Sequence, residues 1–317
     1  MAHIPGMIRA MAAVPCVHLA DPQANAQEIL ALLRQADEQR AELCVFPELC
    51  LCGYTCADLL LHPPLLAGCL QALETLLHAP VRAAFVVGLP LEIGGRLYNC
   101  AAAVCGGRIL GVVPKAHLPN SGEFYEKRHY CAAPAGVKEI SFAGQKTLFG
   151  TKLLFRCETM QAFTLAVEIC EDLWAPLPPS TAHALAGATV LANLSASDET
   201  VGKAEYRRAL VSQQSARLLC AYLYADAGHG ESTTDMVFSG HNLIAENGAL
   251  LAESRPFSQA LACTELDLGR LLAERRRNTS FEPVTDGYET VSFHLPLREI
   301  PLTRYISPTP FVPADGG

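Results

Sequence analysis

Strand-like and helix-like segments alternate along most of this chain, and paired glycines separate several of them. Residues 23–41 carry apolar side chains at helical spacing, whereas 83–90 is a short apolar run typical of a buried strand. Gly94-Gly95 and Gly106-Gly107 each link two such runs through two residues, which indicates a β-hairpin. Hairpins mixed with strand–helix units fit neither a TIM barrel nor a simple Rossmann sheet. We therefore predict an α/β fold in which two sheets pack face to face between helices, a four-layer α-β-β-α sandwich.

The same patterns predict the remaining elements. Several prolines after residue 295 interrupt any long helix or strand, so we divide the chain into a domain over 1–280 and an arm or linker over 281–317. A last hairpin should turn at Asn247-Gly248. The other expected helices are 63–78, 203–219 and 265–277, and the other expected strands are 43–51, 97–105, 108–115, 136–142, 146–156, 161–169, 188–195 and 220–226.

The composition describes a compact globular protein and argues against some kinds of partner. Hydrophobic residues make up 50% of the chain and charged residues 18%, which excludes global disorder. With a net charge of −8, the chain lacks the concentrated basic surface that binds nucleic acid. The one clear basic run, Arg275-Arg276-Arg277, suits the C-terminal end of a helix better. No apolar stretch reaches the roughly 20 residues that cross a bilayer, so we expect no membrane span.

The chain has 13 cysteines, an odd number, and its N-terminus lacks a secretory signal pattern. We therefore expect reduced thiols in a cytoplasmic protein. Cys50, Cys52 and Cys56 lie close together and raise the question of a metal site. Their spacing is poor for zinc, because no Cys-x2-Cys pair occurs and no partner pair follows downstream. We expect no metal here and interpret these thiols as small buried hydrophobic side chains.

Three predicted strands run directly into a reactive residue, namely Glu48, Lys115 and Cys170. Loops at the carboxyl ends of strands are where ligands collect in layered α/β proteins. Each residue alone has an ordinary explanation, since a strand end can carry a solvated charge and most cysteines are simply buried. An acid, a base and a thiol in the same type of position together indicate an active site.

Characteristic motifs surround these residues: Pro47-Glu48-Leu49 followed by Gly53-Tyr54, Lys115 followed by Leu118-Pro119, and Cys170-Glu171-Asp172-Leu173-Trp174. Through them the chain resembles the nitrilase, or carbon–nitrogen hydrolase, superfamily. Other motifs narrow the resemblance to one branch, the glutaminase part of glutamine-dependent NAD+ synthetases, and the likeness covers nearly the whole chain. These motifs are Glu123-Phe124-Tyr125-Glu126-Lys127-Arg128, Asn193-Leu194-Ser195-Ala196-Ser197, Gly230-Glu231-Ser232-Thr233-Thr234-Asp235, Val237-Phe238-Ser239-Gly240-His241 and Pro310-Phe311-Val312-Pro313.

The resemblance implies a cysteine amidohydrolase with a Glu-Lys-Cys triad. The Cys170 thiolate would attack the side-chain amide of L-glutamine, ammonia would leave, and water would hydrolyse a γ-glutamyl thioester. Glu48 would be the general base, and Lys115 would stabilise the oxyanion together with the backbone N–H that follows Cys170. Glu126 resembles a second carboxylate that keeps the lysine charged and oriented. Its alternative role is that of a surface residue paired with its basic neighbours.

The resemblance also implies a set of substrate-binding residues. Glu171 would bind the amino group of glutamine, Ser197 and Lys203 would bind its carboxylate, and Trp174 would form a wall of the pocket. An equally good alternative is that Ser197 and Lys203 cap and begin the predicted helix. Ser121 stands where the family often has a tyrosine after Leu-Pro-Asn, so the resemblance implies a substrate contact there without the aromatic ring.

Full-length members of this branch carry a second domain that uses ATP, Mg2+ and deamido-NAD, with a Ser-Gly-Gly-x-Asp-Ser phosphate loop that this sequence lacks. We therefore interpret the chain as an isolated amidase domain whose partner would be its own synthetase domain, with homo-oligomers expected from the superfamily. Its own chemistry should need no cofactor. Three alternatives remain open: a free-standing amidase acting on another small amide, a catalytically weak regulatory or assembly module, and a metal-binding protein.

Overall fold

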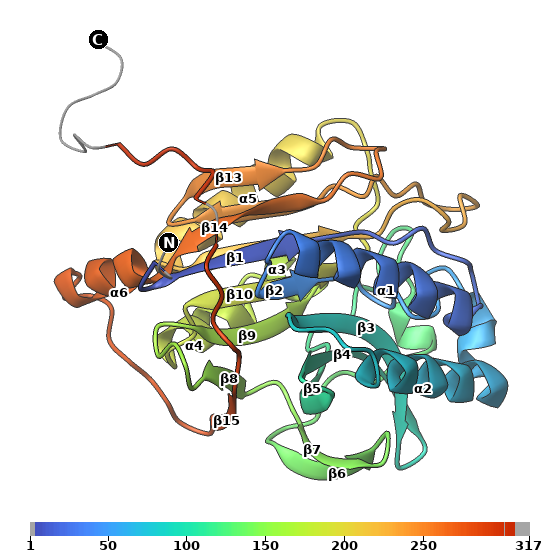
Figure 1. Cartoon of the computed structure of the whole chain (residues 1–317). Helices are drawn as coiled ribbons and strands as arrows, with labels where there is room; N and C mark the ends of the chain where they lie inside the picture. Colours follow the sequence, from blue (N-terminus) through green and yellow to red (C-terminus); the bar gives the residue numbers. More distant parts are fainter. Residues whose placement is uncertain (1–3, 301, 308–317) are drawn as a thin grey trace.

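Two β-sheets form the centre of the molecule (Figure 1), in a computed structural model that describes residues 4–300 and 302–307. The first sheet contains β1 (Met7–Ala12), β2 (Leu43–Val45), β3 (Ala84–Ile93), β4 (Arg96–Cys105), β5 (Arg108–Pro114), β6 (Lys138–Phe142), β7 (Gln145–Phe149) and β14 (Ala262–Asp267). The second contains β8 (Leu153–Cys157), β9 (Thr164–Ile169), β10 (Val190–Ser195), β11 (Ala221–Asp226), β12 (Leu243–Glu246), β13 (Ala249–Glu253) and β15 (Glu289–Phe293). Their orders are β14-β1-β2-β3-β4-β5-β7-β6 and β13-β12-β11-β10-β9-β8-β15.

Helices cover the outer faces of both sheets. Helices α1 (Pro22–Glu38) and α2 (Pro63–Leu77) lie side by side and bury their apolar faces against the first sheet. Helices α4 (Pro179–Leu185) and α5 (Lys203–Leu218) pack on the second sheet. The short helix α3 (Glu171–Trp174) follows β9, and α6 (Leu268–Arg277) follows β14. The order of layers is therefore helix, sheet, sheet, helix.

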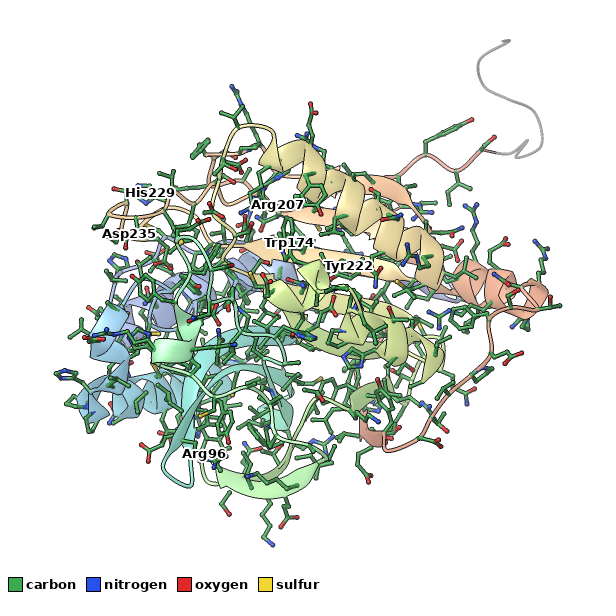
Figure 2. All side chains as sticks on the ribbon, turned by 180° about the vertical axis from the view of Figure 1, so that it is seen from behind. Arg96, Trp174, Arg207, Tyr222, His229 and Asp235 are labelled. Atoms are coloured by element: carbon green, nitrogen blue, oxygen red, sulfur yellow. The ribbon has the colours of Figure 1, made fainter. Side chains whose placement is uncertain are left out.

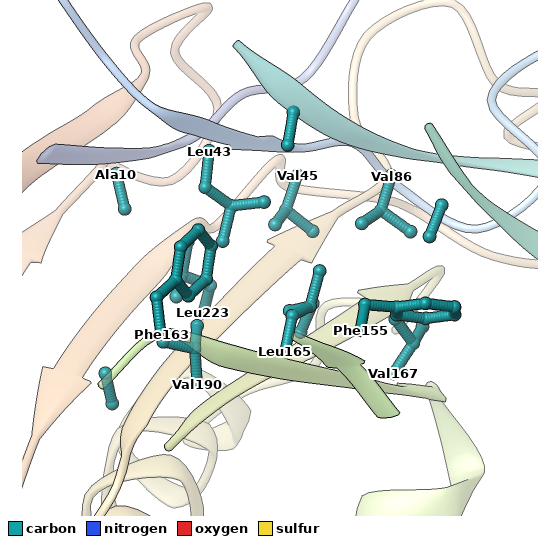
Figure 3. Close-up of a cluster of buried hydrophobic side chains, with 14 of the residues drawn as sticks. Ala10, Leu43, Val45, Val86, Phe155, Phe163, Leu165, Val167, Val190 and Leu223 are labelled. Carbon is teal, nitrogen blue, oxygen red and sulfur yellow. The ribbon is translucent and has the colours of Figure 1, made fainter. Parts of the chain in front are cut away.

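The main hydrophobic core lies between the two sheets, where side chains of opposite strands meet (Figure 3). Val45 and Val86 extend from the first sheet toward Leu165 and Val167 of the second. Each fully buried aliphatic side chain of this kind contributes roughly 1.5–3 kcal/mol of transfer free energy. Strands in the middle of the sheets are buried on both faces, which explains why they appear in the sequence as continuous apolar runs. The predicted four-layer α-β-β-α sandwich is confirmed.

The hairpins turn where the sequence predicts them. Gly94-Gly95 joins β3 to β4, Gly106-Gly107 joins β4 to β5, and Asn247-Gly248 joins β12 to β13. Both residues of the last turn have positive φ, 47° for Asn247 and 86° for Gly248, as a two-residue hairpin loop requires. The first two turns connect β3, β4 and β5, the strands that carry Asn99 and lead to Lys115.

The predicted strand over 43–51 begins at the right residue but is too long, because β2 ends at Val45 and the chain then turns across β3. Gly88 of β3 makes this turn possible. A Cβ atom at that position would lie 2.3 Å from the backbone nitrogen of Leu49 and 2.7 Å from the carbonyl oxygen of Pro47. The apolar run after Val45 is buried between layers without pairing as a strand, and Glu48 lies within this turn.

Other corrections concern boundaries. The single strand expected over 146–156 is two strands, β7 and β8, which belong to different sheets. Helix α6 begins at Leu268 instead of 265, since Asp267 caps it by accepting the N–H of Arg270 at 2.9 Å. The edge pair β1 and β14 had no counterpart among the predicted elements.

The basic run at 275–277 lies in the last turn of α6 and is consistent with the predicted helix-end role. Arg275 also serves a neighbouring helix, because its guanidinium donates to the carbonyl oxygens of Leu218 and Leu219 at the end of α5, each at 3.0 Å. These carbonyls have no partner within their own helix. The contact therefore joins the ends of two helices.

Part of the region expected to be an arm adds to the second sheet. Strand β15 pairs in parallel with β8, and the chain then runs along the ends of both sheets (Figure 1). Arg298 forms an ion pair with Asp37 at 3.3 Å, and Arg304 binds both carboxylate oxygens of Glu246 at 2.9 Å. The motif Pro310-Phe311-Val312-Pro313 lies outside the described residues.

Candidate active site

Cys170 occupies a sharp turn between β9 and α3. Its backbone has a φ of 46°, which is strained for a residue with a Cβ atom. Two contacts from β10 hold this conformation, because the backbone N–H of Cys170 donates to the carbonyl oxygen of Leu194 at 2.9 Å and to Oδ1 of Asn193 at 3.2 Å. The turn brings the thiol to the carboxyl end of the second sheet.

Glu48 is buried and belongs to the turn over Gly88. Its backbone N–H donates to the carbonyl oxygen of Ser195 at 3.3 Å, which ties the first sheet to the end of β10. The side chain of Asn99 on β4 donates to Oε1 of Glu48 at 2.5 Å. Within the described part of the chain, Oε2 of the same carboxylate has no hydrogen-bond partner. One oxygen of Glu48 is thus held in place while the other retains its full capacity to accept a proton.

Lys115 follows β5 directly, and its ammonium group is fully buried between two carboxylates. Nζ lies 2.6 Å from Oε1 of Glu48 and 2.6 Å from Oε1 of Glu126. Burial alone would lower the pKa of Lys115, but the charges of Glu126 and Glu48 raise it well above its usual value. The two carboxylates therefore favour the charged form of the lysine.

Glu126 lies at the start of a short 3-10 helix, Glu126–Arg128, and is buried. The hydroxyl of Tyr54 donates to Oε1 of Glu126 at 2.8 Å, next to the contact with Lys115. Burial raises the pKa of Glu126 to about 7, although the neighbouring ammonium opposes this shift. Glu126 thus contacts Lys115, the position expected of a supporting carboxylate. It is not in a surface ion pair with Arg128, which pairs with Asp58 at 2.7 Å.

The thiol of Cys170 is buried among these charges. Burial raises its pKa well above the usual value, the negative charge of Glu48 adds to the shift, and the ammonium of Lys115 opposes it. Burial and Glu48 thus favour the thiol over the thiolate, so nucleophilic attack calls for a base. The carboxylate of Glu48, with its unpartnered oxygen, suits that requirement.

Asp172 connects the thiol turn with the segment after Lys115. Its carboxylate accepts the backbone N–H of Ile169 at 2.9 Å and that of His117 at 2.8 Å. Because these two residues flank the positions of Cys170 and Lys115, a single side chain sets the distance between the two loops. Burial raises the pKa of Asp172 to about 6.

The structure brings together most of the residues expected to bind substrate. The ammonium of Lys203 lies 5.6 Å from the ring centroid of Trp174 and forms an ion pair with Asp198. Glu171 is half-buried; burial raises its pKa, and the charges of Lys115 and Lys203 both act on it in the opposite direction. These charged groups therefore lie in one neighbourhood beside the thiol turn.

Ser197 and Ser121 differ in burial, since Ser197 is buried and Ser121 is exposed. Helix α5 begins at Lys203 after Gly202, and no side chain caps it, so the predicted capping role of Ser197 is wrong. Ser121 is exposed, and its carbonyl oxygen accepts the N–H of Phe124 at 3.1 Å.

A cavity of about 200 Å³ lies next to the carboxylate of Glu126. Tyr54 and Phe124 also line it, and Phe124 contacts Lys203, whose ammonium lies 5.8 Å from the centre of the ring. Cys170 is not among its lining residues. The cavity thus reaches the supporting carboxylate and an aromatic neighbour of the substrate-binding group.

Sequence patterns missed three polar residues that organise the site: the hydroxyl of Tyr54, Asn99 and Asn193. Asn99 and Asn193 each interrupt an apolar strand, in 96–105 and in 190–195, and both are fully or almost fully buried. A buried amide must find partners, so an asparagine inside an apolar strand was a usable signal. For Tyr54 the only usable signal was weaker, namely that it belongs to the motif Gly53-Tyr54.

Cys50, Cys52 and Cys56 are buried, and the latter two pack in a cluster with Cys69. The thiol of Cys56 donates to the carbonyl oxygen of Cys52 at 3.1 Å. Among residues 4–300 and 302–307, no group of His, Cys, Asp and Glu side chains is arranged to hold a metal ion. Over the same ranges, every helix is too short or too polar to cross a membrane.

Comparison with known proteins indicates the family to which this chain belongs. Residues 10–276 match the family model described as carbon-nitrogen hydrolase, a range that contains Glu48, Lys115, Glu126 and Cys170. The chain belongs to the carbon–nitrogen hydrolase family. Members of this family are enzymes that act on carbon–nitrogen bonds, so the chain is an amidohydrolase.

Curated relatives of this hydrolase carry the name glutamine-dependent NAD(+) synthetase. The protein from Mycobacterium tuberculosis is 43% identical over 323 residues, covering 98% of this chain and 48% of its own length. That from Mycobacterium leprae is 40% identical over 327 residues, with the same two coverages of 98% and 48%. The chain therefore spans about half the length of the curated relatives it matches.

Solved structures of the family share the fold. A glutamine-dependent NAD(+) synthetase from Cytophaga hutchinsonii superposes with a TM-score of 0.72 at 29% identity, covering 87% of this chain and 46% of its own. An amidase from Nesterenkonia superposes with a TM-score of 0.65 at 21% identity, covering 88% of this chain and 98% of its own. This second likeness concerns the fold alone.

Proposed function

We propose that this hydrolase is a glutaminase that releases ammonia from the side-chain amide of L-glutamine through a thioester on Cys170. The observation that supports the proposal is the buried ammonium of Lys115 near the thiol. Its Nζ lies 2.6 Å from Oε1 of Glu48 and 2.6 Å from Oε1 of Glu126. An arrangement of this kind is costly to bury and has no evident role in folding. It supports a Glu48-Lys115-Cys170 triad with Glu126 as the supporting carboxylate.

The first half of the reaction forms the thioester. Oε2 of Glu48 takes the proton of the Cys170 thiol while the sulfur attacks the amide carbonyl carbon. The carbonyl oxygen becomes an oxyanion, which the ammonium of Lys115 and the backbone N–H after Cys170 stabilise. Glu48 then delivers its proton to the amide nitrogen, the carbon–nitrogen bond breaks, and ammonia leaves.

The second half releases the product. Glu48 takes a proton from a water molecule, whose oxygen attacks the γ-glutamyl thioester carbon. The carbon–sulfur bond breaks, Cys170 regains a proton, and glutamate leaves. The same carboxylate acts as base in both halves, and its proton returns to the sulfur when the carbon–sulfur bond breaks. Lys115 keeps its proton throughout.

Glutamine is the substrate named for the relatives, and the charged groups beside the thiol suit its zwitterionic end. Glu171 would pair with the α-amino group, and Lys203 with Ser197 would meet the α-carboxylate. Trp174 and Phe124 lie against Lys203 and would exclude water from that end. Ser121 has no part in this proposal.

We also propose a destination for the ammonia. The relatives' name and the half of their length that this chain does not span support an ATP-dependent synthetase domain as the partner. That domain would use Mg2+ and deamido-NAD and would amidate the latter with the ammonia formed here. The amidase itself would need no cofactor, and we expect it to work as a homo-oligomer in the cytoplasm.

Ammonia release by the purified chain tests this function. L-glutamine is compared with a panel of other small amides, for wild type and for Cys170→Ala. We expect glutamine to be the best substrate and the variant to lose at least about 10³-fold in turnover. Retained activity in the variant would contradict the thiol mechanism, and a better substrate in the panel would contradict the glutaminase assignment.

A further inference from the structure

Arg207 lies on α5, one helical turn after Lys203, and is fully buried (Figure 2). Its guanidinium faces the loop 196–199, which follows β10 and carries Ser197. A buried arginine is rare unless several acceptors surround it. Its neighbours are Glu199 Oε2 at 3.0 Å, His241 Nδ1 at 2.9 Å, Ser197 Oγ at 3.3 Å, the Asp198 carbonyl oxygen at 3.3 Å and Asp226 Oδ2 at 3.7 Å.

The contact with Arg207 determines how the hydroxyl of Ser197 is used. A guanidinium can only donate hydrogen bonds, so Oγ of Ser197 accepts this one. The hydroxyl proton is then left for a different acceptor. The backbone N–H of Ser197 donates to Oδ1 of Asp226 at 2.8 Å, which fixes the position of the residue from the other side. Ser197 is therefore prepared to donate to an anion.

The contact with Arg207 also determines the tautomer of His241. Its Nδ1 accepts from Arg207, so the ring is neutral with the proton on Nε2, which donates to Glu253 at 2.6 Å. Burial lowers the pKa of His241, in agreement with the neutral ring. Arg207 is thus the donor in its hydrogen bonds to both His241 and Ser197.

Arg207 also acts on Lys203 through Asp198. The carbonyl oxygen of Asp198 accepts from the guanidinium, while its side chain holds the ammonium of Lys203. That ammonium lies over the rings of Trp174 and Phe124. One buried side chain therefore supports both groups that would meet the carboxylate of an amino-acid substrate.

We propose that Arg207 is a positioning residue that makes the site selective for amides with an α-carboxylate. This inference rests on the proposed glutaminase function. Arg207 does not touch the substrate; it orients the hydroxyl of Ser197 and holds the loop that anchors Lys203. Its removal weakens recognition of the carboxylate and leaves the triad at Cys170 intact.

Two substrates separate this role from a general structural one. L-glutamine carries the α-carboxylate, and 4-aminobutanamide is the same molecule without it. In Arg207→Met we expect KM for glutamine to rise about 10- to 100-fold, the size of one hydrogen bond to a charged group, with kcat little changed. Hydrolysis of 4-aminobutanamide should keep its wild-type kcat/KM, and Arg207→Lys should recover part of the loss.

A parallel loss of kcat/KM for both substrates, or no change for either, would overturn the inference. If Arg207→Met does not fold, Glu199→Gln provides the test, because it removes one anchor of the guanidinium on the half-buried side. The same selectivity pattern at smaller size is expected, and equal effects on both substrates overturn the inference. Arg208→Met is the matched control, since Arg208 is more exposed and binds Glu253 instead of the loop.

A different experimental result would refute the proposed function. A folded wild-type chain that neither hydrolyses glutamine nor binds it in the Cys170→Ala background refutes the glutaminase assignment and this inference with it. A wild type that hydrolyses glutamine, with Arg207 variants that show no substrate selectivity, refutes only the role of Arg207.

Discussion

Lys115 and Arg207 are both fully buried cations that lie between carboxylates, but they use their hydrogen bonds differently. Lys115 places one nitrogen at 2.6 Å from two carboxylates, and each of those, Glu48 and Glu126, has a second oxygen without a partner among the described residues. Arg207 spreads two terminal nitrogens over a carboxylate, an imidazole, a hydroxyl and a carbonyl.

This difference separates a reactive cluster from a supporting one. Unpartnered carboxylate oxygens beside a thiol can accept and return protons, so the Lys115 cluster has chemical capacity in addition to charge. The planar fork of Arg207 is suited to holding a loop in one geometry. Two buried cations in one protein can thus serve turnover and selectivity separately. Removing either should change a different kinetic quantity.

The largest expected effect is that of Lys115→Met. It leaves two buried carboxylates without their cation, which should lower the free energy of unfolding by about 3–5 kcal/mol. Turnover of glutamine and 4-aminobutanamide should both fall by roughly 10³-fold, because the oxyanion loses its cationic partner. Denaturant unfolding and steady-state kinetics measure the two losses. Wild-type turnover in this variant would show that Lys115 has no catalytic role, so that its cluster would not differ from that of Arg207 in function.

A smaller effect is expected from Asn99→Leu. The change keeps the size of the side chain but removes the donor that holds Oε1 of Glu48 at 2.5 Å. A hydrogen bond to a charged group contributes about 1.5–3 kcal/mol, so kcat should fall roughly 10- to 100-fold for either substrate. Asn25→Leu is the matched control, since Asn25 is equally buried but bonds only backbone groups of His18 and Leu51. Equal losses of kcat in the two variants would show that Asn99 has no special role.

The most gradual expected effect is in the pH dependence of stability, measured as the difference between wild type and Glu126→Gln. Burial raises the pKa of Glu126 from 4.5 to about 7. A group whose pKa is higher in the folded state stabilises the fold below pH 4.5, and this contribution disappears as pH rises through about 7.

The free energy of unfolding of wild type should therefore decrease over this window by up to about 1 kcal/mol per pH unit relative to Glu126→Gln. Other buried acids, such as Glu168 and Asp226, are present in both proteins and cancel in the difference. Urea unfolding at several pH values measures it. Parallel curves would mean that Glu126 stays ionised in the fold as easily as in the unfolded chain.

The layered fold was predictable because its signals are local. Glycine pairs and Asn247-Gly248 define the hairpins, and apolar runs of strand length define the buried strands. The run after Val45 misled the prediction because burial alone does not distinguish a strand from a turn between layers. Only Gly88, a distant residue that lets the turn cross β3, explains why β2 stops early.

The reactive residues were predictable by type and position, but their partners were not. Glu48, Lys115 and Cys170 each follow an apolar run, so their placement near the strand ends could be expected. The bond from Asn99 to Glu48 joins residues 51 positions apart and depends on the register of β4. Ser197 and Arg207 show the same limit, because a helical spacing does not reveal that a side chain points inward to a loop.

Detection of the acyl-enzyme tests the central claim most directly. Wild type, Glu48→Gln and Cys170→Ala are mixed with L-glutamine, quenched in acid and examined by intact-protein and peptide mass spectrometry. We expect a γ-glutamyl group on the peptide containing Cys170 in wild type, none in Cys170→Ala, and much slower formation in Glu48→Gln. A wild type that releases ammonia with no adduct at any quench time, or an adduct on a different cysteine, would contradict it.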